Sequence, residues 1–341
     1  MRQSHPPYFF CAFLIPRHRS TTAPLGPMRF TDTVYETNRF PVCQAVNILS
    51  VKIACSDVGF PIQVYGTVIA RDSIDSKCLH LFRRDTDHCQ LINSKDEPLI
   101  LTGPKRGLVL IDNNYVETDL KIKDHQGQDR QLSKGIAMIR GIRGRSTESE
   151  VETESIDTRL STVDVMYAVV KRSVEAIKVL RGEVHGIITA YTTSVQKRIV
   201  LSDSKLAGAE TGDGDGDIKL MRSVVSVSVK DVLIIDAKTH GGKFVCNEFT
   251  PRGNKWKTVV STLGATTMPM GEAERLRQEA LDEARLMEDE ARARRHRAQA
   301  RILDFDPKHL LQPIVRGGDK FEITVGDTQM LVHVTWSIMD W

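Results

Sequence analysis

The sequence lacks the features that mark several classes of protein. Aromatic residues make up only 6% of its 341 residues, and its six cysteines include no C-x-x-C pair. Small secreted disulfide scaffolds carry cysteine far more densely. The sequence also contains no N-x-S/T glycosylation sequon. These absences favour a reducing compartment, cytoplasmic or nuclear, over secretion.

Long apolar runs are absent as well. A membrane helix needs about 20 consecutive apolar residues. The longest run near the start covers residues 8–15 and is closed by Pro16. We therefore expect no membrane span and a disordered leader over residues 1–40. Because the first acidic residue is Asp32, an organelle transit peptide stays open as an alternative.

An excess of one charge is also absent. The chain has 47 basic and 44 acidic side chains, which leaves a formal net charge of +3. A charge so close to balance predicts no strong attraction of the whole molecule to nucleic acid. We expect a protein partner and no cofactor.

The sequence does contain segments in which apolar and polar residues alternate with a period of two. They cover residues 62–71, 225–230 and 330–338. Alternation of this kind places one set of side chains inward and the other outward, as in a strand. Turn residues separate many such short segments. The pattern predicts a mainly β fold of antiparallel β-sandwich units.

One β-rich phrase occurs twice in the chain. Residues 60–82 and 182–201 align at Gly66 and Gly186, which are 120 residues apart. Flanking matches pair Ser50 with Ser173 and Arg106 with Arg222, at offsets of 123 and 116. The repeat predicts a tandem duplication of one β unit, although alternating strands also resemble each other by chance.

These observations predict an order of segments along the chain. We expect a leader at 1–40, a first β unit at 41–143, an acidic linker or loop at 144–156, a second β unit at 157–270, a charged α-helix at 271–302, and a return to the sheet with a C-terminal strand at 303–341.

The predicted helix at 271–302 has a narrow apolar stripe. Its positions step by four, four, three and four residues, which follows one helix face: Leu276, Ala280, Ala284, Met287 and Ala291. Such a helix could join two copies of the chain. Its second half carries a basic patch that could bind phosphates or act as a nuclear import signal, or could be a solvated helix end: Arg292, Arg294, Arg295, Arg297 and Arg301.

Glu272 and Arg275 form an E-x-x-R pair like that of ribosome-inactivating N-glycosidases. No aromatic residue lies in the surrounding helix, so the sequence predicts no catalytic residue here or elsewhere.

Two clusters could bind metals. Asp213, Asp215 and Asp217 alternate with glycine and could ligate calcium. Second-loop partners would come from Asp72, Asp75, Asp85 and Asp87. The alternative is a flexible turn. In the same way, Cys78, His80, His88 and Cys89 offer zinc ligands at a spacing that matches no standard finger, and buried cysteines beside a polar turn are the alternative.

Several longer segments resemble the plant family built on domain of unknown function 6598. The matching segments are "VKIACSDVGFPIQVYGTVIARDSID", "LTGPKRGLVLIDNNYVETDLKIKD", "VVKRSVEAI", "HGIITAYTTS" and "MRSVVSVSV". The resemblance covers residues 27–265 and the closing "GDTQMLVHVTWS". It implies a stress or defence setting in a cereal grass and names no ligand. The charged stretch at 271–302 interrupts the family pattern.

The sequence leaves three functions open. The first is a non-catalytic interaction module. The second is a sandwich that binds a glycan or a lipid headgroup, with calcium through Asp213, Asp215 and Asp217. The third is an enzyme with an unfamiliar site.

Overall fold

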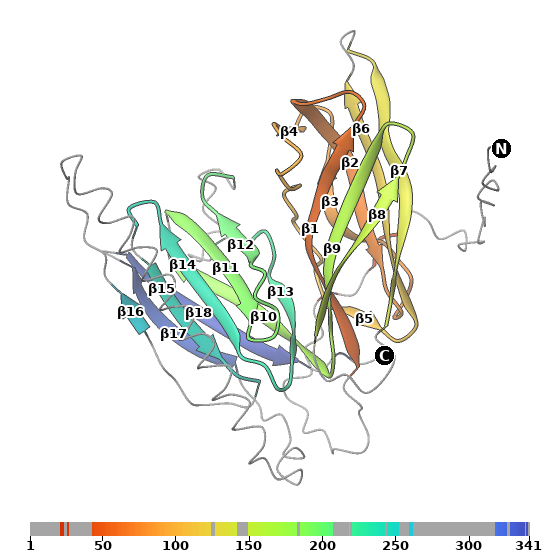
Figure 1. Cartoon of the computed structure of the whole chain (residues 1–341). Helices are drawn as coiled ribbons and strands as arrows, with labels where there is room; N and C mark the ends of the chain where they lie inside the picture. The colour runs from red at the N-terminus through yellow and green to blue at the C-terminus, as the bar shows by residue number, and fades with distance from the viewer. Residues whose placement is uncertain are drawn as a thin grey trace, which may run out of the picture.

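The described part of the chain consists of strands and their connections (Figure 1). The structure is a computed structural model. It describes residues 21–23, 26, 43–123, 127–141, 149–182, 185–206, 218, 220–242, 244–251, 259–261, 318–325, 328–337 and 339.

Strands β1 to β9 form a first sandwich. One sheet has the order β5-β1-β9-β8, and the other has the order β3-β2-β6-β7 with β4 paired to β2. All the pairings are antiparallel. The strands are β1 (Gln44–Ser56), β2 (Ile62–Arg71), β3 (Leu79–Arg84), β4 (Gln90–Ile92), β5 (Leu108–Leu110), β6 (Asn113–Lys123), β7 (Asp129–Arg140), β8 (Glu150–Asp157) and β9 (Ser161–Val170).

Strands β10 to β18 form a second sandwich. Its sheets have the orders β13-β10-β18-β17 and β12-β11-β14-β15-β16. The strands are β10 (Ser173–Gly182), β11 (Gly186–Thr192), β12 (Ile199–Asp203), β13 (Val224–Ser228), β14 (Leu233–Thr239), β15 (Phe244–Phe249), β16 (Val259–Ser261), β17 (Gly318–Val325) and β18 (Thr328–Ser337).

Each sandwich has its own apolar core, filled by the inward residues of both sheets. In β6 every second residue is buried, and in β9 the same alternation brings Val163, Val165 and Tyr167 into the first core. The second core contains Val225, Ile235 and Trp336 among others. Burial of these alternating positions supplies the main driving force for both sandwiches.

The two sandwiches share one topology, and the match extends to register. β2 and β3 shift register after Val68, and β11 and β12 shift after Ile188. Gly66 and Gly186 also have equivalent places. A Cβ on Gly66 would lie 2.2 Å from the carbonyl oxygen of Asp119, and one on Gly186 would lie 2.1 Å from that of Lys238. Both glycines therefore permit the same close approach of a neighbouring strand.

The flanking matches drawn from the sequence stay predictions. Val46 pairs with Leu108 in the first sandwich, and both side chains lie in its core. In the second core, Ala176 pairs with Val225 and Val174 pairs with Val227. The ladder therefore offers two equivalents of Val46, because an alternating strand resembles itself after a shift of two residues.

The predicted fold class included one long charged α-helix, and that part of the prediction is wrong. The described residues contain no helix, and the segment 271–302 lies outside them, between β16 and β17. Helical periodicity shows that apolar residues could line up on one face. Periodicity alone does not show that the apolar face would pack against another surface, and such packing is what stabilises most helices. In the described residues, strands fill both sandwich cores.

The acidic linker predicted at 144–156 also needs correction. Residues Glu150–Asp157 form β8, which pairs with β9, and the first sandwich therefore continues to Val170. β8 is an edge strand whose described side chains are exposed except for Ile156. A strand exposed on both faces shows no apolar alternation, because its hydrogen-bond ladder stabilises it instead. In the predicted disordered leader, Thr22 forms an isolated parallel β-bridge with Cys78 of the first sandwich.

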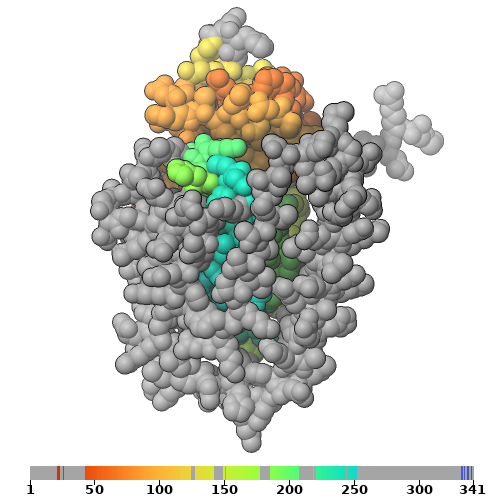
Figure 2. Space-filling view, turned by 90° about the vertical axis from the view of Figure 1, so that its left-hand side faces the viewer, coloured from red at the N-terminus to blue at the C-terminus, as the bar shows by residue number. Residues whose placement is uncertain are grey.

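The outer face of β1 and β9 packs against the second sandwich (Figure 1). Leu49 and Ala168 belong to strands of the first sandwich but join the second core. The Arg222 guanidinium donates to the carbonyl oxygen of Ile48 at 2.7 Å. Figure 2 shows the orange residues of the first sandwich above the green and cyan residues of the second.

Candidate anion-binding pocket

Several of the predicted calcium ligands accept hydrogen bonds from other protein groups. Asp72 is buried and accepts two hydrogen bonds from the Arg106 guanidinium, one of them 3.0 Å long. Asp75 accepts from the same guanidinium at 3.3 Å. Asp85 accepts from the backbone amides of Asp87 and His88 in a turn. These carboxylates stabilise loops of the first sandwich, and Asp213, Asp215 and Asp217 lie outside the described residues.

The predicted zinc ligands do not converge. Cys78 is buried and its backbone pairs with residues 21 and 23. His88 is exposed and its Nδ1 lies 2.7 Å from Asp85. Among the residues that the structure describes, no three His, Cys, Asp or Glu side chains could hold one metal ion. The basic patch from Arg292 to Arg301 and the pair Glu272 and Arg275 fall outside those residues.

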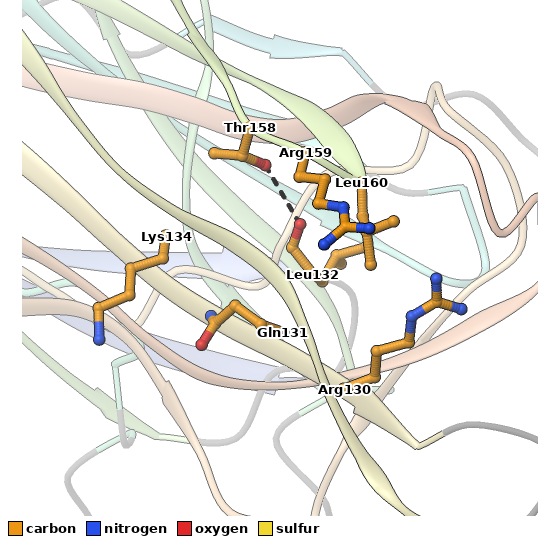
Figure 3. A pocket seen from close by; sticks show the side chains of 7 residues that line it. All are labelled: Arg130, Gln131, Leu132, Lys134, Thr158, Arg159 and Leu160. Carbon is orange, nitrogen blue, oxygen red and sulfur yellow. Dashed lines mark hydrogen bonds between the residues drawn. The ribbon is translucent and has the colours of Figure 1, made fainter. Parts of the chain in front are cut away.

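A pocket of about 480 Å³ lies at one end of the first sandwich, in the seam between its two sheets (Figure 3). One wall comes from β7 and the other from the turn between β8 and β9. The lining residues are Arg130, Gln131, Leu132, Lys134, Thr158, Arg159 and Leu160.

A β-bulge in β7 shapes the floor of the pocket. Leu120 pairs with Ser133 and Lys121 pairs with Gln131, so Leu132 is the extra residue. The Leu132 side chain is buried, and its carbonyl oxygen faces the opposite wall of the seam. Bulges commonly redirect side chains next to functional sites, and here the bulge separates Arg130 from Lys134.

Hydrogen bonds hold the bulge in place from both sides. The Thr158 hydroxyl donates to the Leu132 carbonyl at 3.2 Å (Figure 3), and the Ser161 hydroxyl donates to the same carbonyl at 2.8 Å. The Gln131 amide donates to the carbonyls of Leu120 and Ser133, both at 2.9 Å. The walls are therefore joined before any ligand arrives, which lowers the entropic cost of binding.

The rim of the pocket is cationic. Arg130, Lys134 and Arg159 are exposed, and no described carboxylate forms an ion pair with either arginine. Lys134 lies 3.5 Å from Asp119, where both side chains are well exposed, and such a pair contributes little. Exposed cations around a pre-formed pocket can bind an anionic group through charge-assisted hydrogen bonds.

Nearby aspartates moderate this positive charge. Asp157 accepts from the Thr162 hydroxyl at 2.8 Å, and Asp119 accepts from the Gln131 amide at 3.1 Å. Asp129 lies near Tyr65, where burial first and this carboxylate second raise the pKa of Tyr65 to about 12. None of these aspartates lines the pocket.

Sequence reasoning did not find this pocket. It assigned Arg130 to the first β unit and Arg159 to the second, on opposite sides of the predicted linker or loop at 144–156, and it named neither as a site residue. The repeat does not point to the pocket either. In the second sandwich β14 and β15 correspond to β6 and β7, and their pairing has no bulge.

Comparison with protein families identifies the chain over most of its β structure. The family described as "Domain of unknown function (DUF6598)" matches residues 45–268. The chain belongs to this family. The match runs from β1 to just beyond β16, so it covers the first sandwich with its pocket and the second sandwich except β17 and β18. No curated protein matches the chain.

Solved structures show only distant likeness to this DUF6598 protein. One is described as human GIVD cytosolic phospholipase A2, at 9% identity and a TM-score of 0.22, covering 87% of this chain and 33% of that one. Another is described as a pair of C2 domains of Extended-Synaptotagmin 2, at 8% identity and a TM-score of 0.23, covering 94% of this chain and 100% of that one. The chain thus spans about a third of the phospholipase chain.

The described residues include no helix with the length and apolar character needed to cross a bilayer.

Proposed function

We propose that this DUF6598 protein is a non-catalytic β-sandwich binding module whose pocket binds an anionic group, with phosphate as the best fit. One observation carries the proposal. Arg130 and Arg159 face a pre-formed pocket from opposite sides of the sheet seam, and neither has a described carboxylate partner. Guanidinium groups bind phosphate oxygens in a planar, two-pronged arrangement.

The chemistry around the pocket supports binding of a small oxyanion. Lys134 adds an ammonium group on the β7 side, and the Thr158 hydroxyl lies between the two walls. All three cationic side chains are solvated, so each contact is weaker than in a buried site. We expect inorganic phosphate alone to bind with a dissociation constant on the order of 1 mM.

The test is a titration of the full chain with inorganic phosphate, followed by NMR of the arginine Nε–H groups. The variant Arg130→Gln/Arg159→Gln should weaken binding at least about tenfold, because a charged hydrogen bond contributes about 1.5–3 kcal/mol. The charge-matched control is Arg83→Gln/Lys95→Gln, which changes two exposed residues away from the pocket. Equal affinity in both double variants would overturn the proposal.

A further inference from the structure

The outer face of β7 carries exposed apolar side chains beside the pocket. Ile136 is 46% exposed and Met138 is 37% exposed. They follow Lys134 at alternate positions of the strand, so all three side chains lie on the same face of the sheet. Arg140 is the next residue on that face and is exposed as well. We name Lys134, Ile136, Met138 and Arg140 the β7 row.

The neighbouring strand continues this surface. Tyr115 on β6 lies opposite Met138, and Glu117 lies opposite Ile136. Tyr115 is half-buried, which places an aromatic ring next to the apolar pair. Aromatic rings with a polar end are common at the boundary between membrane and water.

The acidic groups on this face are already bound. Glu117 accepts from the Arg71 guanidinium at 2.7 Å. Asp119, opposite Lys134, accepts from Gln131 at 3.1 Å and lies 3.5 Å from Lys134. Arg140 at the far end of the β7 row and Arg130 and Arg159 at the pocket form no ion pair with a described carboxylate, so cations outnumber the uncompensated acids on this face.

Two exposed apolar side chains flanked by cations fit one kind of partner best. A soluble phosphate compound would use the pocket and leave Ile136 and Met138 in water. The surface of an anionic bilayer would contact both the cations and the apolar pair, because cations bind its headgroups while apolar side chains enter the acyl boundary. We propose that the pocket and the β7 row together form a docking surface for anionic phospholipid membranes, and that the pocket holds a lipid phosphate. This inference rests on the anion site proposed above.

The distances along the strand suit this arrangement. Successive residues on one face of a strand are about 7 Å apart, so Ile136 and Met138 lie about 7 and 13 Å from Lys134. A membrane surface that lies along β7 can therefore contact the apolar pair while a neighbouring headgroup occupies the pocket.

The experiment is co-sedimentation of the full chain with vesicles of phosphatidylcholine containing about 30% phosphatidylserine, compared with phosphatidylcholine alone. We expect binding to the anionic vesicles only. The variant Ile136→Ser/Met138→Ser should weaken vesicle binding about tenfold and leave the phosphate titration unchanged. The matched control is Leu91→Ser/Val200→Ser, which removes two other exposed apolar side chains and should bind vesicles like the unaltered chain.

The outcomes separate the two proposals. Phosphate binding without vesicle binding would overturn the membrane inference and leave the anion site intact. Vesicle binding that survives Ile136→Ser/Met138→Ser would also overturn it, because the β7 row would then be uninvolved. Absence of both kinds of binding would overturn both proposals. Loss of vesicle binding in Arg130→Gln/Arg159→Gln and in the β7-row variant, but not in the control, would support both.

Discussion

The side chain of Asn47 hydrogen-bonds both backbone groups of Ser226, which lies 179 residues later in the chain. Its Nδ2 donates to the Ser226 carbonyl at 2.7 Å, and its Oδ1 accepts from the Ser226 amide at 2.9 Å. Ser226 lies in β13, which is an edge strand of the second sandwich. One side-chain amide of the first sandwich therefore satisfies the backbone groups at a strand edge of the second, in the manner of a neighbouring strand.

Asn47→Ala should destabilise the protein by about 2 kcal/mol or more, because it leaves two buried backbone groups unpaired. Urea denaturation measures this loss. Ser226→Ala is the matched control. It keeps the backbone bonds and removes a buried hydroxyl that has no described partner, so we expect little change. Similar losses in both variants would show that packing at this junction, and not the amide pair, supplies the stability.

Two buried arginines should respond differently to removal. Arg106 binds Asp72, and Arg106→Met would leave a buried carboxylate without its partner at a cost of about 3–5 kcal/mol. Arg222 donates to a carbonyl oxygen and has no carboxylate partner among the described residues. Burial lowers the pKa of Arg222 to about 10.

Arg222→Met removes a buried charge that the fold disfavours but also removes the donor to the Ile48 carbonyl, so it should cost about 1–3 kcal/mol, less than Arg106→Met. Guanidinium chloride denaturation of both variants tests the contrast. An equal loss in the two variants would contradict it.

Neither of the two equivalent glycines should tolerate a side chain. Gly66→Ala and Gly186→Ala each place a Cβ within about 2.2 Å of a backbone oxygen, which neighbouring strands can relieve only by moving apart. We expect each to cost at least about 2 kcal/mol. Gly241→Ala is the control, because its nearest neighbour is 3.8 Å away. Hydrogen exchange should show the loss mainly in the sandwich that carries the substitution, and a loss spread evenly over both would contradict independent cores.

His80 should make stability depend on pH. Burial, followed by the nearby cations Arg83 and Lys105, lowers the pKa of His80 below 6.5. The unfolded chain then binds a proton at a higher pH than the folded chain does. Acidification from about pH 6.5 down through the folded pKa therefore destabilises the fold.

His80→Gln removes this contribution. The unaltered protein should lose stability relative to the variant as the pH falls from about 7 to about 5, as measured by thermal unfolding. A difference that stays constant over this range would show that His80 does not titrate differently in the two states.

The repeat shows which parts of the structure can be aligned from the sequence pattern. Gly66 and Gly186 aligned in the sequence and occupy equivalent places in the structure, because a mid-strand glycine marks a close backbone approach that few other residues permit. The flanking matches are not fixed in this way, because an alternating pattern cannot distinguish one register from another two residues away.

The sequence alone predicts antiparallel strands, because period-two alternation assigns each residue to the core or to solvent. It also predicts that one β unit occurs twice. That β8 is a strand follows only from the packed structure, since its stability comes from the ladder with β9 and not from burial. The place of the pocket follows from the packing too. Arg130 and Arg159 line it from two sides of a sheet seam that the bulge at Leu132 and the hydroxyls of Thr158 and Ser161 hold together. Which residues lie across a seam from each other depends on how the sheets pack, and no local pattern encodes that packing.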